Sequence, residues 1–244
     1  MLMEKYPIVI LPGWLLGGKR FERLRLGFEK KGFPAFVVDF PGFEDSPPLK
    51  EVFDLTDYVK DLHHFLKINK IHKAIFVAHS FGGRVALKFL SQHPDRAVAL
   101  ILSGTPGYPE LAPWRRYVTV SIAKFGNLLA SIPPFMITRP LLRKLFYRVT
   151  KTTDYARVSG VMRETFKKII KEQLVDYMHK IRIPTLLLWG GSDRLVSVKI
   201  ARKMQMTIKN SRLVIIPEKG HMFAYREPEV IVDEVTGFLK QLFV

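Results

Sequence analysis

Short hydrophobic runs alternate with longer amphipathic segments through the first hundred residues. The hydrophobic runs, each consistent with a buried strand, lie at residues 8–11, 35–40, 74–78 and 98–102. The amphipathic segments between the first three runs have the spacing of helices and lie near residues 20–31 and 55–66. This alternation is typical of parallel strands buried beneath helices on both faces. We therefore predict an α/β fold with a mostly parallel central sheet flanked by helices.

The alternation stops in the middle of the chain and later resumes. Residues 107–180 have long helical patterns and no convincing buried strand, and Pro-containing segments mark both borders. After the second border, strand-like runs return at residues 184–189 and 212–216, and an amphipathic run closes the chain at residues 230–243. We predict a core made of residues 1–106 and 181–244, with residues 107–180 inserted as a helical cap, or lid.

One serine stands where a hydrophobic run changes abruptly into a helical pattern. Residues 75–90 predict a strand, a sharp turn at Ser80 and a helix. Such a turn lifts the serine hydroxyl out of the backbone at the carboxyl end of a sheet, where it can attack a substrate. Ala78 and Gly82, two positions to either side, are small enough for strand and helix to approach closely.

Residues 78–82 read Ala-His-Ser-Phe-Gly, which resembles the Gly-x-Ser-x-Gly nucleophile elbow of the α/β-hydrolase superfamily, with Ala78 in place of the first glycine. The resemblance extends over nearly the whole chain outside the middle. Residues 39–46 also resemble the family's Asp-x-Pro-Gly-x-Gly-x-Ser turn, with Glu44 where glycine is common and with a structural role. The resemblance implies an α/β-hydrolase fold with a helical cap inserted after the sixth strand.

A serine hydroxyl needs a base, and the base needs a group that orients it. Asp193 follows a strand-like run in a Gly-rich turn, and His221 follows the next run after a glycine. The family has the chain order Ser, Asp or Glu, His, so the resemblance implies a triad of Ser80, Asp193 and His221. A turn-forming or capping role is the alternative for Asp193, and Glu218 is the nearest competing acid.

The resemblance also implies two backbone N–H groups that bind the developing oxyanion. One belongs to Phe81, directly after the nucleophile, and the other to Trp14 in the Gly-rich loop at residues 11–18. Pro12 replaces the histidine that is customary in this loop. The donor is a backbone group, so this replacement leaves it intact.

Four further residues are candidates for substrate binding, namely Leu15, His79, Phe135 and Arg163. We expect His79 to form a wall of the site, and Phe135 in the cap could line an acyl pocket. Arg163 could meet a substrate carboxylate, with a solvated helix face as the alternative. Arg84, one helical turn after Ser80, is expected to be a packing or surface residue.

The formal net charge of +17 predicts attraction to anionic surfaces or acidic substrates. The expected cap holds fourteen Lys and Arg against five Asp and Glu, so weak contact with anionic membrane is one possibility. A lysine-rich surface without any partner is the other. No zinc-finger, RRM or helix-turn-helix pattern accompanies the charge, so we expect no specific nucleic-acid partner.

Zero cysteines exclude disulfides and thiol chemistry. We expect no metal or cofactor. The sequence shows no run long enough to cross a membrane and no leader pattern at its start, so we expect a cytoplasmic protein. Oligomeric state is not indicated.

These features predict a serine hydrolase of the carboxylesterase type (EC 3.1.1), which cleaves a small-molecule ester through an acyl-enzyme. Serine at residue 80 argues against dehalogenases and epoxide hydrolases, which use aspartate there. Three alternatives remain open: a C–C bond hydrolase of dienoate-like ketones, for which a basic cap would suit an acidic substrate; a thioesterase; and a hydrolase-like ligand-binding protein with little turnover.

Overall fold

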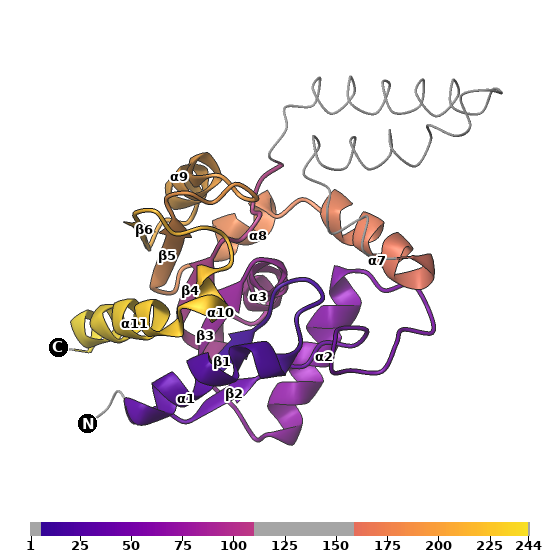
Figure 1. The fold of residues 1–244 in the computed structure, drawn as a ribbon, viewed down its shortest axis with the longest axis horizontal. Helices are drawn as coiled ribbons and strands as arrows, with labels where there is room; N and C mark the ends of the chain where they lie inside the picture. The colour runs from indigo at the N-terminus through magenta and orange to yellow at the C-terminus, as the bar shows by residue number, and fades with distance from the viewer. Residues whose placement is uncertain (1–5, 110–158, 244) are drawn as a thin grey trace.

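A computed structural model describes residues 6–109 and 159–243. Their centre is a six-stranded sheet in which every neighbouring pair of strands is parallel, in the order β2-β1-β3-β4-β5-β6 (Figure 1). The strands are β1 (Ile8–Leu11), β2 (Ala35–Val37), β3 (Ala74–His79), β4 (Ala97–Ser103), β5 (Thr185–Gly190) and β6 (Ser211–Ile216). The predicted parallel α/β sheet is therefore confirmed.

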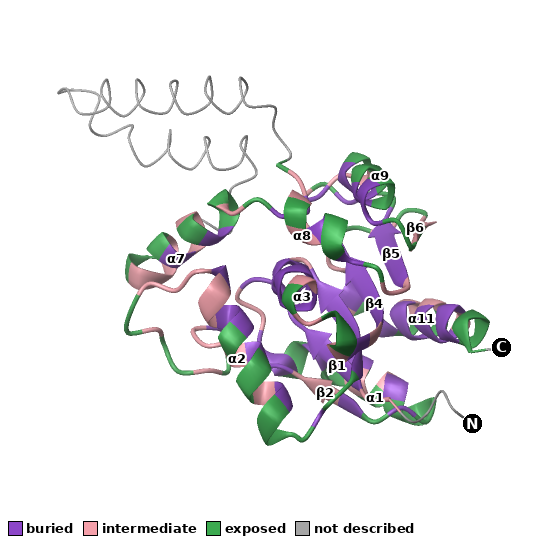
Figure 2. Ribbon diagram, turned by 180° about the vertical axis from the view of Figure 1, so that it is seen from behind, coloured by how far each residue is buried: buried purple, intermediate pink, exposed green. Residues whose placement is uncertain are grey.

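Helices cover both faces of this sheet (Figure 2). One face carries α1 (Glu22–Lys30) and α11 (Pro228–Leu242), and the other carries α2 (Leu55–Ile68), α3 (Phe81–Gln92), α8 (Val175–Lys180) and α9 (Val198–Thr207). Side chains of a strand point alternately to the two faces. Accordingly, Ile8 and Ile10 of β1 pack on the face that carries α1 and α11, whereas Val9 and Leu11 pack on the opposite face.

The remaining elements are short or lie beside the sheet. They are the 3-10 turns η2 (Gly18–Phe21) and η3 (Pro94–Arg96), together with α7 (Gly160–Lys171) and α10 (Phe223–Arg226). Helix α7 follows the undescribed segment 110–158 and lies at the end of the molecule near α2 (Figure 1).

The order of the elements corrects one expectation. The segment predicted as a cap follows β4, the fourth strand of the described chain, and not a sixth strand. The sequence before residue 107 contains four strand-like runs, which correspond to β1, β2, β3 and β4 of the sheet. The division into a core and a cap at residues 107–180 stays a prediction. Within that range, α7 and α8 are helical, as expected.

Element boundaries differ from the sequence pattern by a few residues. Strand β2 ends at Val37, earlier than the hydrophobic run that continues to residue 40. Helix α2 begins after Asp54, whose carboxylate accepts a hydrogen bond from the Thr56 N–H at 2.6 Å. In turn, the Asp57 carboxylate accepts a hydrogen bond from the Asp54 N–H at 2.9 Å. This reciprocal cap satisfies amide groups that the first turn leaves without partners.

None of the helices within residues 6–109 and 159–243 combines the length and the hydrophobicity that a membrane-spanning helix requires.

Candidate active site

Ser80 lies at the junction of β3 and α3 with a φ of 51° and a ψ of −110°. A positive φ is strained for a residue with a side chain, and such strain is concentrated at functional sites. Close packing enforces the turn, because a Cβ on Gly82 would lie 2.3 Å from the carbonyl oxygen of Leu11. The predicted strand, turn and helix around Ser80 are therefore present.

Asp193 and His221 come together from the loops that follow β5 and β6. The Nδ1 atom of His221 lies 2.8 Å from Oδ2 of Asp193. The other carboxylate oxygen of Asp193 accepts the backbone N–H groups of Leu195 and Val196, each at 2.8 Å. Asp193 is therefore held from both sides and is buried. An ionised carboxylate in this position fixes the imidazole with its proton on Nδ1.

The two loops are tied to each other by backbone hydrogen bonds. Gly191 donates to the Ile216 carbonyl at 2.8 Å, and Ser192 donates to the Lys219 carbonyl at 2.9 Å. A Cβ on Gly190 would lie only 2.3 Å from the Lys219 oxygen. Glu218, the competing acid, is exposed, whereas the bond of His221 goes to Asp193.

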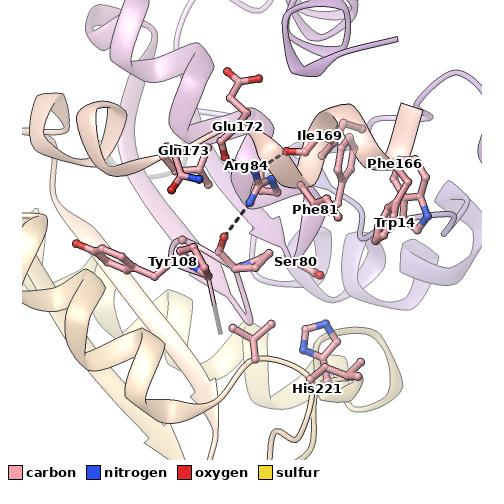
Figure 3. Close-up of a pocket in the computed structure, with 17 residues that line it drawn as sticks. Trp14, Ser80, Phe81, Arg84, Tyr108, Phe166, Ile169, Glu172, Gln173 and His221 are labelled. Carbon is pink, nitrogen blue, oxygen red and sulfur yellow. Dashed lines mark hydrogen bonds between the residues drawn. The ribbon is translucent and has the colours of Figure 1, made fainter. Parts of the chain in front are cut away.

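Ser80 and His221 border the same two cavities. An inner cavity of about 260 Å³ is lined by these residues together with Trp14, Arg84, Phe166 and Ile169, among others (Figure 3). An outer cavity of about 710 Å³ shares Trp14, Ser80 and His221, and adds Leu15, His79 and Tyr225 among others. Within the described part of the chain, the Ser80 hydroxyl makes no hydrogen bond.

The loop before η2 places Trp14 beside the N-terminus of α3. Trp14 packs edge-on against Phe81, with ring centroids 5.4 Å apart, and both residues line the inner cavity. Leu15 has a φ of 60° and lines the outer cavity. Residues 14 and 81 therefore flank Ser80, where two backbone donors for an oxyanion are expected.

The turn at residues 39–46 anchors this loop, a role that the sequence pattern did not reveal. The Asp39 carboxylate accepts the Gly18 N–H at 2.6 Å, and Glu44 accepts the Gly17 N–H at 3.2 Å. Glu44 also accepts a hydrogen bond of 2.6 Å from Arg20 Nε. The carboxylate at residue 44, where the family commonly has glycine, could have indicated such a bond.

His79 is buried beside the site. Its Nδ1 lies 3.2 Å from the Ser103 carbonyl, and its ring centroid lies 4.9 Å from that of His221. Burial, and secondarily the nearby His221, hold the pKa of His79 well below its usual value. His79 therefore forms a neutral wall of the outer cavity.

The remaining predicted residues have different outcomes. Phe135 lies outside the described residues. Arg163 is half-buried on α7 and does not line either of the two cavities. Arg84, expected on the surface or in simple packing, is buried and lines the inner cavity. No group of three or more potential metal ligands occurs within residues 6–109 and 159–243.

The sequence profile of the alpha/beta hydrolase fold family matches residues 6–228. This match covers most of the chain, and the protein belongs to that family. Similar proteins include a pimeloyl-[acyl-carrier protein] methyl ester esterase of Vibrio vulnificus, which is 22% identical over 95% of this chain and 93% of its own.

Three proteins show how similar this chain is to other members of the family and to solved structures. The AB hydrolase superfamily protein YisY of Bacillus subtilis is 27% identical, over 95% of this chain and 91% of its own. The 2-hydroxy-6-oxononadienedioate/2-hydroxy-6-oxononatrienedioate hydrolase of Burkholderia vietnamiensis is 24% identical, over 92% and 83%. A solved thermophilic esterase from Thermogutta terrifontis has a TM-score of 0.72 at 21% identity, covering 98% of this chain and 91% of its own, which supports the fold alone.

Proposed function

We propose that this member of the alpha/beta hydrolase family is a serine hydrolase that cleaves a carboxylic ester through an acyl-enzyme. The observation that carries the proposal is the 2.8 Å contact between His221 Nδ1 and Asp193 Oδ2, at the border of the cavities that Ser80 also lines. An imidazole oriented in this way can accept a proton at Nε2, which is the role required of a general base.

In the acylation step, Ser80 Oγ attacks the ester carbonyl carbon and its proton passes to His221 Nε2. The carbonyl oxygen becomes an oxyanion, which accepts hydrogen bonds from the backbone N–H groups of Trp14 and Phe81. The tetrahedral intermediate then collapses, and the departing alkoxide takes the proton from His221. Asp193 accepts the Nδ1–H bond throughout and stabilises the imidazolium.

Deacylation repeats the sequence with water as the nucleophile. His221 takes a proton from water as the hydroxide oxygen bonds to the acyl carbon, and it returns the proton to Ser80 Oγ as the acid leaves. No metal or cofactor takes part in this proposal.

A serine-directed fluorophosphonate probe, together with p-nitrophenyl esters graded by acyl length, tests the proposal. We expect the wild-type protein to be labelled and to turn over esters, and Ser80→Ala to lose both properties. Ser91→Ala, which changes another serine on α3 whose hydroxyl bonds the Lys88 carbonyl, is the matched control and should keep both. Tight binding of an ester without turnover by wild type would instead favour a ligand-binding protein.

A second candidate is C–C bond hydrolysis of an acidic dienoate-like ketone, which the same three residues could perform. It is favoured by the similarity to the Burkholderia vietnamiensis hydrolase. An acidic vinylogous diketone added to the ester panel separates the two candidates, because each predicts the higher kcat/KM for its own substrate.

A further inference from the structure

Arg84 carries a positive charge in the interior of the protein, one helical turn after Ser80. Only 7% of its surface is exposed. Burial lowers the pKa of Arg84 to about 10, and the nearby Glu172 opposes this effect. A buried charge is costly unless the surrounding groups satisfy it, so its partners indicate its role.

The guanidinium donates to three backbone carbonyls from two separate segments. Nη1 donates to Pro106 at 3.0 Å, while Nη2 donates to Ile169 at 2.7 Å and to Glu172 at 2.8 Å (Figure 3). Ile169 and Glu172 lie at the carboxyl end of α7. Carbonyls at a helix end lack partners within the helix and carry the negative end of its dipole, so a cation is stabilised there.

Lys88, one turn further along α3, holds the same end of α7. Its Nζ lies 2.6 Å from Glu172 Oε1 and 2.9 Å from the hydroxyl of Thr56. The hydroxyl of Tyr177 donates to Glu172 Oε1 at 2.7 Å. Both the backbone and the side chain of Glu172 are therefore bound to groups of the core.

Helix α7 in turn contacts the loop that carries the proposed oxyanion donor. The ring of Phe166 lies 5.1 Å from that of Trp14, and Phe166 and Ile169 both line the inner cavity. At the middle of α7, the buried hydroxyl of Thr165 accepts the Phe53 N–H at 3.1 Å. The helix is thus a wall of the cavity that is anchored on two sides.

We propose that Arg84 is a positioning residue for catalysis. It fixes the carboxyl end of α7 to α3, the helix that begins after Ser80. This keeps Phe166 packed against Trp14 and keeps the α7 wall of the inner cavity in place beside Ser80. Arg84 acts through α7, because both of its Nη atoms donate to backbone carbonyls; its Nε is buried without a hydrogen-bond partner among the described residues. This inference rests on the proposed hydrolase activity.

The test compares Arg84→Met, which keeps the bulk of the side chain and removes its hydrogen bonds, with wild type. Arg96→Met is a matched control, because Arg96 also donates to backbone carbonyls, those of His72 and Ile71, and lies outside both cavities. The rates are divided by the concentration of sites that the fluorophosphonate probe labels, so that an unfolded fraction does not lower kcat.

We expect Arg84→Met to raise KM for p-nitrophenyl hexanoate about ten-fold, as the loss of a set of buried hydrogen bonds and a shifted wall imply. The acetate ester, which reaches less of the inner cavity, should change less. Arg96→Met should lower thermal stability and leave KM unchanged. Low millimolar guanidinium should restore part of the lost hexanoate activity to Arg84→Ala, which a purely structural role would not produce.

A second variant keeps the proposal testable if Arg84→Met does not fold. Phe166→Leu removes the ring that contacts Trp14 and leaves Arg84 in place, and it should reproduce the hexanoate effect. An unchanged KM for the hexanoate ester in Arg84→Met, or in Phe166→Leu, would overturn the positioning role.

A hemisuccinate ester separates positioning from direct binding of an anion. Equal losses for the hemisuccinate and a neutral ester of the same length support positioning, whereas a loss confined to the hemisuccinate overturns it in favour of a carboxylate site. Absence of labelling and turnover in wild type would instead refute the proposed hydrolase function, so the two failures are distinguishable.

Discussion

Gly104, directly after β4, lies against the imidazole of His221. A Cβ placed on Gly104 would be 2.9 Å from both Cε1 and Nδ1 of His221 and 3.4 Å from Asp193 Oδ2. Gly104 also has a φ of 57°, which favours glycine. The absence of a side chain at residue 104 therefore leaves room for the ring that Asp193 orients.

Gly104→Ala should displace this ring and lower kcat about 100-fold, because misplacement by about 1 Å can cost that much. Gly160→Ala is the matched control: Gly160 has a φ of 52°, but a Cβ there would meet nothing within 4 Å. Both variants should lose about 1 kcal/mol of stability from backbone strain, measured by urea unfolding. Equal kcat values in the two variants would contradict a role for the contact between Gly104 and His221.

Asp193→Asn should lower kcat about 10⁴-fold with little change in fold. The carbonyl oxygen of the new amide is expected to replace Oδ1, which accepts the N–H groups of Leu195 and Val196. Its NH₂ group then faces His221 Nδ1 and stabilises the tautomer that carries the proton on Nε2, which cannot accept a proton from Ser80. Burst and steady-state kinetics with p-nitrophenyl acetate measure the effect. Asp176→Asn, at an exposed position on α8, should retain activity, and a wild-type rate for the residue 193 variant would refute the orienting role.

The stability of the protein should fall in mild acid because of His79. Its pKa is well below 6.5 in the folded state, so the unfolded chain binds the extra proton first as pH falls. Below about pH 6.5, His79 should reduce the free energy of unfolding by up to about 1.4 kcal/mol per pH unit, until the folded pKa is reached. Above pH 6.5 this contribution is constant.

His79→Asn removes this titration and keeps an amide N–H where Nδ1 faces the Ser103 carbonyl. Urea unfolding between pH 5 and pH 8, a range chosen around the ordinary histidine pKa of about 6.5, should therefore give a flatter profile for this variant. His64→Asn, at an exposed position on α2, is the control and should keep the wild-type slope. A slope for His79→Asn equal to that of wild type would show that another group causes the acid loss.

Two glycines in helices should respond in opposite directions to alanine. Gly237 of α11 has nothing within 4 Å of its virtual Cβ, so Gly237→Ala should stabilise the protein by about 0.5–1 kcal/mol through helix propensity. Gly82→Ala brings a Cβ to 2.3 Å from the Leu11 oxygen and should destabilise by about 2 kcal/mol or more. Thermal unfolding monitored by circular dichroism measures both. A shift of the same sign in the two variants would contradict the close approach of α3 to β1.

The sequence predicts the local features well because they depend on short-range periodicity. The six strand-like runs correspond to β1 to β6, and the change of period at Ser80 indicated the strand, turn and helix that the structure contains. For the acid, the sequence favoured Asp193 over Glu218 without showing which of them meets His221. Asp193 after β5, and not the exposed Glu218, contacts His221.

Sequence patterns fail for residues whose environment is created by distant segments. From its own segment, Arg84 is expected to be a packing or surface residue, whereas in the structure it is buried and bonds Ile169 of α7, 85 residues further along the chain. The anchoring of Gly17 and Gly18 by Glu44 and Asp39 likewise depends on two loops meeting in space.

The sequence by itself determined the class of the fold, the strand, turn and helix around Ser80 and the candidate residues for a site there, because apolar periodicity and turn chemistry are local properties of the chain. Only the tertiary structure decided which carboxylate contacts His221, which cation is buried beside Ser80 and which glycine makes room for the imidazole. These contacts join residues far apart in the chain, such as Gly104 and His221, and packing and desolvation act on them only after the sheet has assembled.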